Sequence, residues 1–273
     1  MSSAEFLDGV RVATVAQNLP GPLACARLRQ AGARVTKVEP PDGDPFLALS
    51  PAWHAEMHDG ITVERVDLKS DSGRARIMAL LADADVFLTS QRPSALARLS
   101  LDPGTLRARV PQLRMLRIVG SLEDPEQPGH DLTYQAQRGL VGSLTPRTLT
   151  ADVMTSERAF ASVLALLRQP PGSVMDIGLV DCLDPMIASL RHGLTSTHGV
   201  LGGAAPRYGV YATKAGRIAV AALETHFEQR LYDQLELPKG SDPSARFLER
   251  TAQEWEQWAD ERALPIVAVR DLY

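Results

Sequence analysis

The chain of 273 residues is 44% hydrophobic, which is enough apolar material for more than one packed domain. Its formal net charge of −4, without any run of Lys or Arg, excludes an electrostatic footprint for nucleic acid or for a membrane surface. No apolar run approaches the length of a membrane span and no signal-peptide pattern opens the chain, so we expect a cytoplasmic protein.

The first half of the chain alternates between strand-like and helix-like segments. Strands are predicted over residues 10–16, 34–39, 61–68, 85–90 and 113–120, and helices over 20–32, 73–84 and 103–111. Residues 42–60 follow no clear period and are expected to be irregular. Strands that alternate with helices indicate crossover connections and a parallel sheet covered on both faces. The sequence therefore predicts an α/β fold whose large domain is a Rossmann-like, doubly wound parallel sheet.

The second half of the chain begins with predicted helices and continues with a glycine-rich linker and a smaller α+β segment. Helices are predicted over 131–142 and 156–169, a buried strand running into a helix over 173–194, and a glycine-rich linker over 199–209. A hairpin over 208–223, turning at Lys214–Gly216, precedes two amphipathic helices over 225–237 and 252–264. We therefore expect a large domain with linker helices over 1–198, a small α+β domain over 199–265 and a return segment over 266–273.

Common catalytic and metal-binding motifs do not occur in the sequence. It contains no phosphate-binding Walker loop and no GxSxG nucleophile turn. Prolines in the segment after the first strand remove amide donors that a dinucleotide-binding loop would need. His54 and His58 are four residues apart, but no acidic third ligand accompanies them in a zinc-protease pattern, so no metal site is predicted.

Three titratable residues stand where helices should begin. His130 follows Pro-Gly, Asp152 precedes a predicted helix and Glu224 lies between a predicted strand and a helix. Sites of α/β folds form at such strand-to-helix junctions. A purely structural explanation is simpler on spacing alone, because Asp131 and Asp152 are ordinary helix-start residues and His130 could be a surface loop residue.

The order of several longer segments resembles CoA-transferase family III, the CaiB/BaiF type. The matching segments are LDGVRVATVAQNLPGPLACARLRQAGARVTKVEPPDGDP, VDLKSDSGRARIMALLADADVFLTSQRPSALARLSLDP, PGHDLTYQAQRGL, GRIAVAALETHF and LPIVAVRDL. They span essentially the whole chain. Within that superfamily, Gly-His-Asp directly before a helix resembles the α-methylacyl-CoA racemase branch.

The resemblance implies roles for particular residues. His130 and Asp152 match an acid–base pair, and Glu224 matches the acid that orients the histidine. The implied CoA-site residues are Asn18, Ser90, Arg92 and Asp131, with Arg92 at the nucleotide end. Asp131 is expected to cap its helix and to offer its backbone amide to the thioester oxygen.

The family fold implied is an interlocked homodimer with Glu224 supplied by the partner chain. The implied partner is an acyl-CoA thioester, so coenzyme A is part of the substrate and no prosthetic group is expected.

The chemistry implied is racemisation of a 2-methylacyl-CoA through an enolate. His130 would move a proton on one face of the α-carbon and Asp152 on the other, with burial raising the pKa of Asp152. The alternative is a CoA-transferase in which the Asp152 carboxylate attacks the thioester and forms a mixed anhydride. A non-catalytic relative with a CoA site is a further alternative.

The sequence also departs from the family pattern. HDGITVERVDLK offers no cation before Arg65 where a basic run is usual, and Pro40 stands where Arg is common. We therefore expect either weaker CoA binding or phosphate contacts that move onto other groups, such as Lys37, Lys69 or Arg92. The chain is C-terminally short relative to the family pattern, which suggests a simpler dimer.

Overall fold

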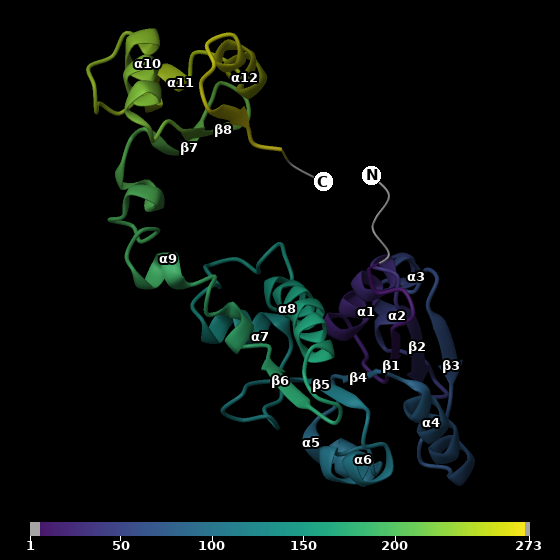
Figure 1. Ribbon diagram of the computed structural model, residues 1–273. Helices are drawn as coiled ribbons and strands as arrows, with labels where there is room; N and C mark the ends of the chain where they lie inside the picture. Colours follow the sequence, from purple (N-terminus) through teal and green to yellow (C-terminus); the bar gives the residue numbers. More distant parts are fainter. Residues whose placement is uncertain (1–5, 271–273) are drawn as a thin grey trace. The chain divides into compact units, whose positions relative to one another are not determined.

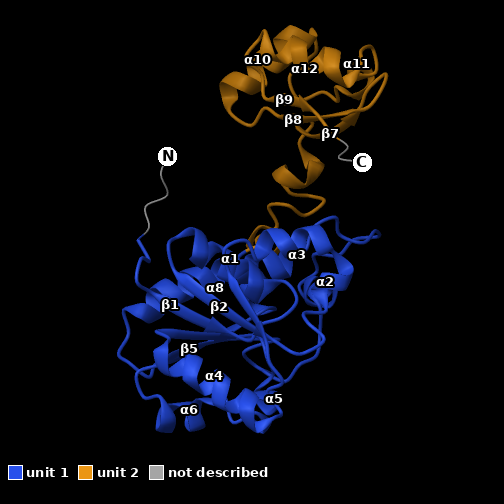
Figure 2. Cartoon of the chain, turned by 90° about the vertical axis from the view of Figure 1, so that its right-hand side faces the viewer, with its two compact units in different colours: residues 1–185 blue, residues 186–273 orange. Residues whose placement is uncertain are grey.

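The computed structural model describes residues 6–270 and forms two compact units, Met1–Pro185 and Met186–Tyr273 (Figures 1 and 2). The division falls 13 residues before the predicted boundary at 198/199, so residues 186–198 group with the second unit. No helix among the described residues is long and apolar enough to cross a membrane.

The first unit is built on a six-stranded sheet whose strands are all parallel. The order across the sheet is β3-β2-β1-β4-β5-β6. The strands are β1 (Arg11–Thr14), β2 (Arg34–Glu39), β3 (Thr62–Arg65), β4 (Val86–Thr89), β5 (Arg114–Val119) and β6 (Val174–Gly178). The chain runs outward from β1 to β3 and then returns to β4, so the order reverses between β1 and β4. Ligands of such sheets bind beyond the carboxyl ends of the strands at this reversal.

Helices cover both faces of this sheet, which confirms the doubly wound prediction (Figure 2). They are α1 (Pro20–Gln30), α2 (Phe46–Leu49), α3 (Pro51–Met57), α4 (Asp71–Asp83), α5 (Pro93–Arg98), α6 (Pro103–Arg109), α7 (Asp131–Gln137) and α8 (Thr150–Leu167). Leu88 packs with residues of α1 and α8 on one face, and Phe87 packs with residues of α4, α5 and α6 on the other. Every residue of β4 is therefore buried, and its sequence begins with three apolar residues, Val86–Leu88, before Thr89.

Several element boundaries differ from the predictions. Residues 46–57 form α2 and α3, where an irregular stretch was expected, because Pro51 starts a helix and Phe46 and Met57 pack on Leu19. Helix α7 ends at Gln137, ahead of Gly139, whose φ of 70° no longer fits a helix. Helix α8 begins at Thr150, six residues earlier than predicted, so Asp152 lies inside its first turn.

The second unit contains a three-stranded antiparallel sheet in the order β7-β8-β9. Its strands are β7 (Tyr208–Ala212), β8 (Arg217–Ala221) and β9 (Ile266–Ala268), and its helices are α9 (Ala188–Arg191), α10 (Thr225–Leu235), α11 (Ser244–Phe247) and α12 (Ala252–Asp260). The predicted hairpin is present as β7 and β8. Residues 266–268, predicted as a return segment, pair with β8 instead and complete the small sheet. Residues 271–273 of that segment lie outside the described residues.

Trp255 is the largest side chain buried in the second unit, and its replacement by Ala should destabilise that unit. The indole N–H donates to the carbonyl of Phe247 over 2.8 Å, and the ring packs edge-on against Phe247 and Trp258. Loss of such a buried aromatic side chain costs about 3–5 kcal/mol. Calorimetry should show earlier melting of the second unit. Trp53→Ala in the first unit is the control. Equal shifts in the melting temperature of the second unit from both variants would contradict the role of Trp255 in the core of that unit.

Candidate active site

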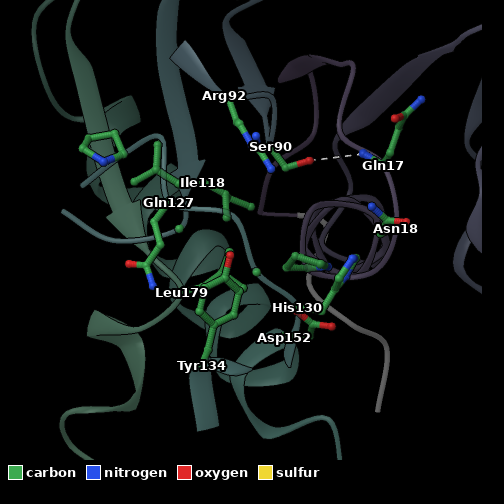
Figure 3. Close-up of a pocket in the computed structure, with 15 residues that line it drawn as sticks. Gln17, Asn18, Ser90, Arg92, Ile118, Gln127, His130, Tyr134, Asp152 and Leu179 are labelled. Carbon is green, nitrogen blue, oxygen red and sulfur yellow. Dashed lines mark hydrogen bonds between the residues drawn. The ribbon is translucent and has the colours of Figure 1, made fainter. Parts of the chain in front are cut away.

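A cavity of about 240 Å³ opens at the point where the strand order reverses (Figure 3). Gln17 and Asn18 reach it from the segment after β1, Ser90 and Arg92 from the segment after β4, and Gly120 from the end of β5. The starts of α7 and α8 contribute another part of the wall, and the loop before α7 and Leu179 complete it. A space of this size encloses a small chemical group and leaves the rest of a large ligand outside.

His130 and Asp152 both line this cavity, although 21 residues separate them along the chain (Figure 3). His130 is the residue that precedes α7, and its side chain is exposed. Thr133 secures the helix start: its hydroxyl donates to the carbonyl of His130 over 2.8 Å and accepts from the His130 N–H over 3.1 Å. Both of these bonds use main-chain atoms of His130, and the residue lines the cavity.

Asp131 does not cap its own helix, which corrects the sequence-based expectation. It is the first residue of α7, only 5% exposed, and its carboxylate turns inward. Gln135 donates to one carboxylate oxygen over 2.5 Å, and the N–H of Asp152 donates to the other over 3.1 Å. The side chain thus ties the start of α7 to the start of α8, which brings His130 and Asp152 into one cavity.

The environment of Asp152 disfavours its ionised form. Burial, together with the nearby negative charge of Asp131, raises its pKa to about 7 from an ordinary value of 3.8. A carboxyl with this pKa exchanges protons readily near neutral pH. The sequence-based expectation that burial raises the pKa of Asp152 is confirmed.

Tyr134 also faces the cavity, and sequence reasoning missed it. Its ring lies against Gly129, where a Cβ atom would approach the ring to 2.5 Å. Burial raises the pKa of Tyr134, and Asp152 raises it further, while Arg92 opposes the shift. The hydroxyl therefore remains protonated and can donate a hydrogen bond. The sequence did contain a signal for Tyr134: it stands four residues after His130, which places both residues on the same face of a helix.

The segment after β1 is held from two sides. The N–H of Gln17 donates to the Ser90 hydroxyl over 3.2 Å (Figure 3). The N–H of Asn18, which has a left-handed φ of 62°, donates to the Asp44 carboxylate over 3.0 Å. The predicted residues Asn18 and Ser90 therefore do meet at the cavity, and Ser90 orders its wall.

The three cations expected to hold CoA phosphates have different surroundings. Lys37 is 1% exposed and paired with Asp44 and Glu39, so the structure contradicts a role for it in phosphate contact. Lys69 lines a second, largely apolar cavity of about 160 Å³, which shares Gln17 with the first. Arg92 lines the first cavity, together with His130 and Asp152.

Glu39 joins the histidine pair that the sequence spacing singled out. One ligand atom from each of Glu39, His54 and His58 lies within 4.8 Å of the others. The Lys37 ammonium lies 3.0 Å from Glu39 Oε1 and 2.8 Å from His58 Nε2, so it already supplies positive charge to this cluster. The arrangement fits a buried charge network better than a metal site.

Glu224 belongs to the second unit. It directly precedes α10 and its side chain is exposed. Its predicted role as the residue that orients His130 stays a prediction.

Comparisons with known proteins agree with this fold. The family model for CoA-transferase family III matches residues 7–272. A CaiB/BaiF CoA-transferase family protein of Caenorhabditis elegans, ZK892.4, is 25% identical over 92% of this chain and 82% of its own length. The α-methylacyl-CoA racemase of Mus musculus is 28% identical over 87% of this chain and 67% of its length.

A Mycobacterium tuberculosis protein, Rv3272, supplies both a sequence and a structural match. It is described as a probable fatty acyl-CoA transferase and is 30% identical over 66% of this chain, which spans about half of its length (51%). Its crystal structure matches with a TM-score of 0.85 at 23% identity, covering 98% of this chain and 86% of that one.

The chain therefore belongs to CoA-transferase family III, a family of enzymes whose members here include both transferases and a racemase.

Proposed function

We propose that this protein is an acyl-CoA racemase or epimerase that inverts the α-carbon of a 2-methylacyl-CoA thioester. The observation that carries the proposal is the meeting of His130 with Asp152, a carboxyl whose pKa is raised to about 7, in one cavity at the switch point of the sheet. An imidazole and a carboxyl in one cavity suit a reaction that removes a proton from one face and returns one to the other.

In this mechanism, His130 takes the α-proton while Asp152, in its protonated form, delivers a proton to the opposite face, and the roles reverse for the other enantiomer. The enolate needs hydrogen-bond donors on the thioester oxygen. The N–H of Asp131 is a candidate donor, because the first amides of a helix have no acceptor within the helix and Asp131 is the first residue of α7. The Tyr134 hydroxyl is a second donor facing the same cavity.

The raised pKa of Asp152 also weighs against the transferase alternative. A CoA-transferase needs the ionised carboxylate as its nucleophile, and burial beside Asp131 makes that form unfavourable. The transferase reaction would additionally leave His130 without a role. Relatives with transferase names keep this second function open, and an acyl adduct on Asp152 would be its signature.

In this proposal, coenzyme A extends from the reacting carbon toward the second cavity, which Lys69 lines. Val38, Pro40 and Leu99 give this cavity apolar walls, which suit the flat face of an adenine ring. Lys69 stands at the same cavity and carries a charge that a phosphate would meet. Homodimer formation, supply of Glu224 by a partner chain and a cytoplasmic location belong to the same proposal.

Hydrogen exchange in heavy water tests the reaction directly. The protein should incorporate deuterium at C2 of a 2-methylacyl-CoA and convert either enantiomer into a mixture, as followed by proton NMR and chiral analysis. No exchange over a panel of such thioesters would contradict the racemase. Hydroxylamine trapping of an adduct on Asp152 would then favour the transferase. A calorimetric titration without CoA binding would favour the non-catalytic alternative.

A further inference from the structure

A buried charge network lies directly behind the wall of the cavity. It is centred on Lys37 of β2, whose side chain is 1% exposed, and includes Asp44, at 0%. Glu39, two residues after Lys37 on the same face of β2, is 2% exposed. Buried charges are costly unless each is paired and hydrogen-bonded, so these contacts must hold each other in a defined arrangement.

The Lys37 ammonium is hydrogen-bonded to Asp44 and to His58, and it forms an ion pair with Glu39. The nitrogen lies 2.5 Å from Asp44 Oδ2, 3.0 Å from Glu39 Oε1 and 2.8 Å from His58 Nε2. The tautomer of His58 follows from its other nitrogen: Nδ1 lies 2.6 Å from the carbonyl oxygen of His54, which can only accept, so Nδ1 carries the proton. The bare Nε2 then accepts from Lys37. Burial lowers the pKa of His58, in agreement with a neutral ring.

Asp44 connects this network to the cavity. Its second oxygen, Oδ1, accepts from the N–H of Asn18 over 3.0 Å and from the N–H of Phe46 over 2.9 Å. Asn18 lines the cavity and has a left-handed backbone, a conformation that is uncommon for residues other than glycine but that asparagine adopts more readily than most. Because Pro20 begins α1 two residues later, the direction of the chain at Asn18 also decides where that helix starts.

We propose that Lys37 and Asp44 are positioning residues, through which a buried ammonium orients a carboxylate that fixes the backbone of Asn18 and so shapes one wall of the active site. Neither side chain lines the cavity. Their effect on turnover rests on the proposed function, whereas their effect on the order of residues 16–19 does not.

Hydrogen–deuterium exchange of the full-length protein, read at residues 16–19 by mass spectrometry, tests the structural part. Asp44→Ala removes the acceptor of the Asn18 N–H and should speed exchange of this segment about tenfold, the worth of one hydrogen bond. Asp44→Asn keeps an acceptor oxygen and should fall between Asp44→Ala and the natural protein. Lys37→Met leaves Asp44 without its counterion and should also speed exchange there.

Asp176→Asn is the matched control. Asp176 forms a two-point ion pair with Arg117 on the same sheet, and neither residue lines the cavity. This variant should leave exchange at residues 16–19 unchanged. Unchanged exchange in Asp44→Ala, or equal acceleration in Asp176→Asn, would overturn the proposal.

Kinetics test the link to the reaction. Misplacement of a catalytic wall by about 1 Å costs roughly a hundredfold in rate, so Asp44→Ala should lower kcat more than it raises KM, with partial recovery in Asp44→Asn. Natural kcat in Asp44→Ala would overturn the positioning role even if exchange increased. If no acyl-CoA is turned over by the natural protein, the proposed function fails, and the exchange experiment still decides whether the network holds Asn18.

Discussion

Replacement of His130 by Ala is expected to lower the rate of α-proton exchange in a 2-methylacyl-CoA by about 10²–10⁴-fold, the usual contribution of a positioned general base. The fold should survive, because the His130 side chain is exposed and Thr133 secures the helix start through main-chain atoms of residue 130. Deuterium incorporation at C2, followed by NMR, measures the loss.

His198→Ala provides the control for this prediction, since His198 is an exposed histidine that does not line the cavity. Its exchange rate should equal that of the natural protein. The same His130→Ala variant separates the two reactions, because anhydride formation at Asp152 does not use the histidine. If His130→Ala exchanges the α-proton at the natural rate, another group is the base and the proposed mechanism is wrong.

Replacement of Asp152 by Asn is expected to abolish activity while stabilising the fold at alkaline pH. The folded-state pKa of Asp152 is raised to about 7 from 3.8. A carboxyl with a raised folded-state pKa contributes its full stability below the unfolded value, and that contribution is lost as pH rises through the folded value. Above pH 7 the natural protein therefore has to bury an unfavourable charge next to Asp131, and Asn removes this charge.

The expected gain in the free energy of unfolding is about 1–3 kcal/mol at pH 8. A shift of one pKa unit corresponds to about 1.4 kcal/mol, and the total is reduced because an open cavity admits water that screens the charge. The gain should be smaller at pH 5, where folded Asp152 is protonated. Urea unfolding at both values measures it. Asp102→Asn is the control of opposite sign, since hydrogen bonds from Thr105 lower the pKa of Asp102 and its removal should destabilise. Equal stability of Asp152→Asn and the natural protein at pH 8 would contradict the raised pKa.

The local pattern of apolar and turn residues in the sequence was sufficient to predict much of the fold. The all-buried strand VFLT and the hairpin around Lys214–Gly216 were identified because apolar runs and turn residues report on their immediate neighbours. The pattern was insufficient for α2 and α3, which are short and are stabilised mainly by packing of Phe46 and Met57 on Leu19. It also misplaced the start of α8, since the turn at Thr150 depends on contacts with α7.

The sequence by itself determined the order of the strands, the family and the placement of His130 and Asp152 near helix starts, because these follow from periodicity and from segments that match in order. Only the tertiary structure decided which charges are buried. In the sequence, Lys37 is indistinguishable from an exposed lysine of a strand. In the structure, Asp44, Glu39 and His58 surround its ammonium group. Asp152 likewise acquires its raised pKa only when Asp131 and the walls of the cavity exclude water around it. Burial and the proximity of charges depend on residues that are distant along the chain, so a local sequence pattern cannot predict them.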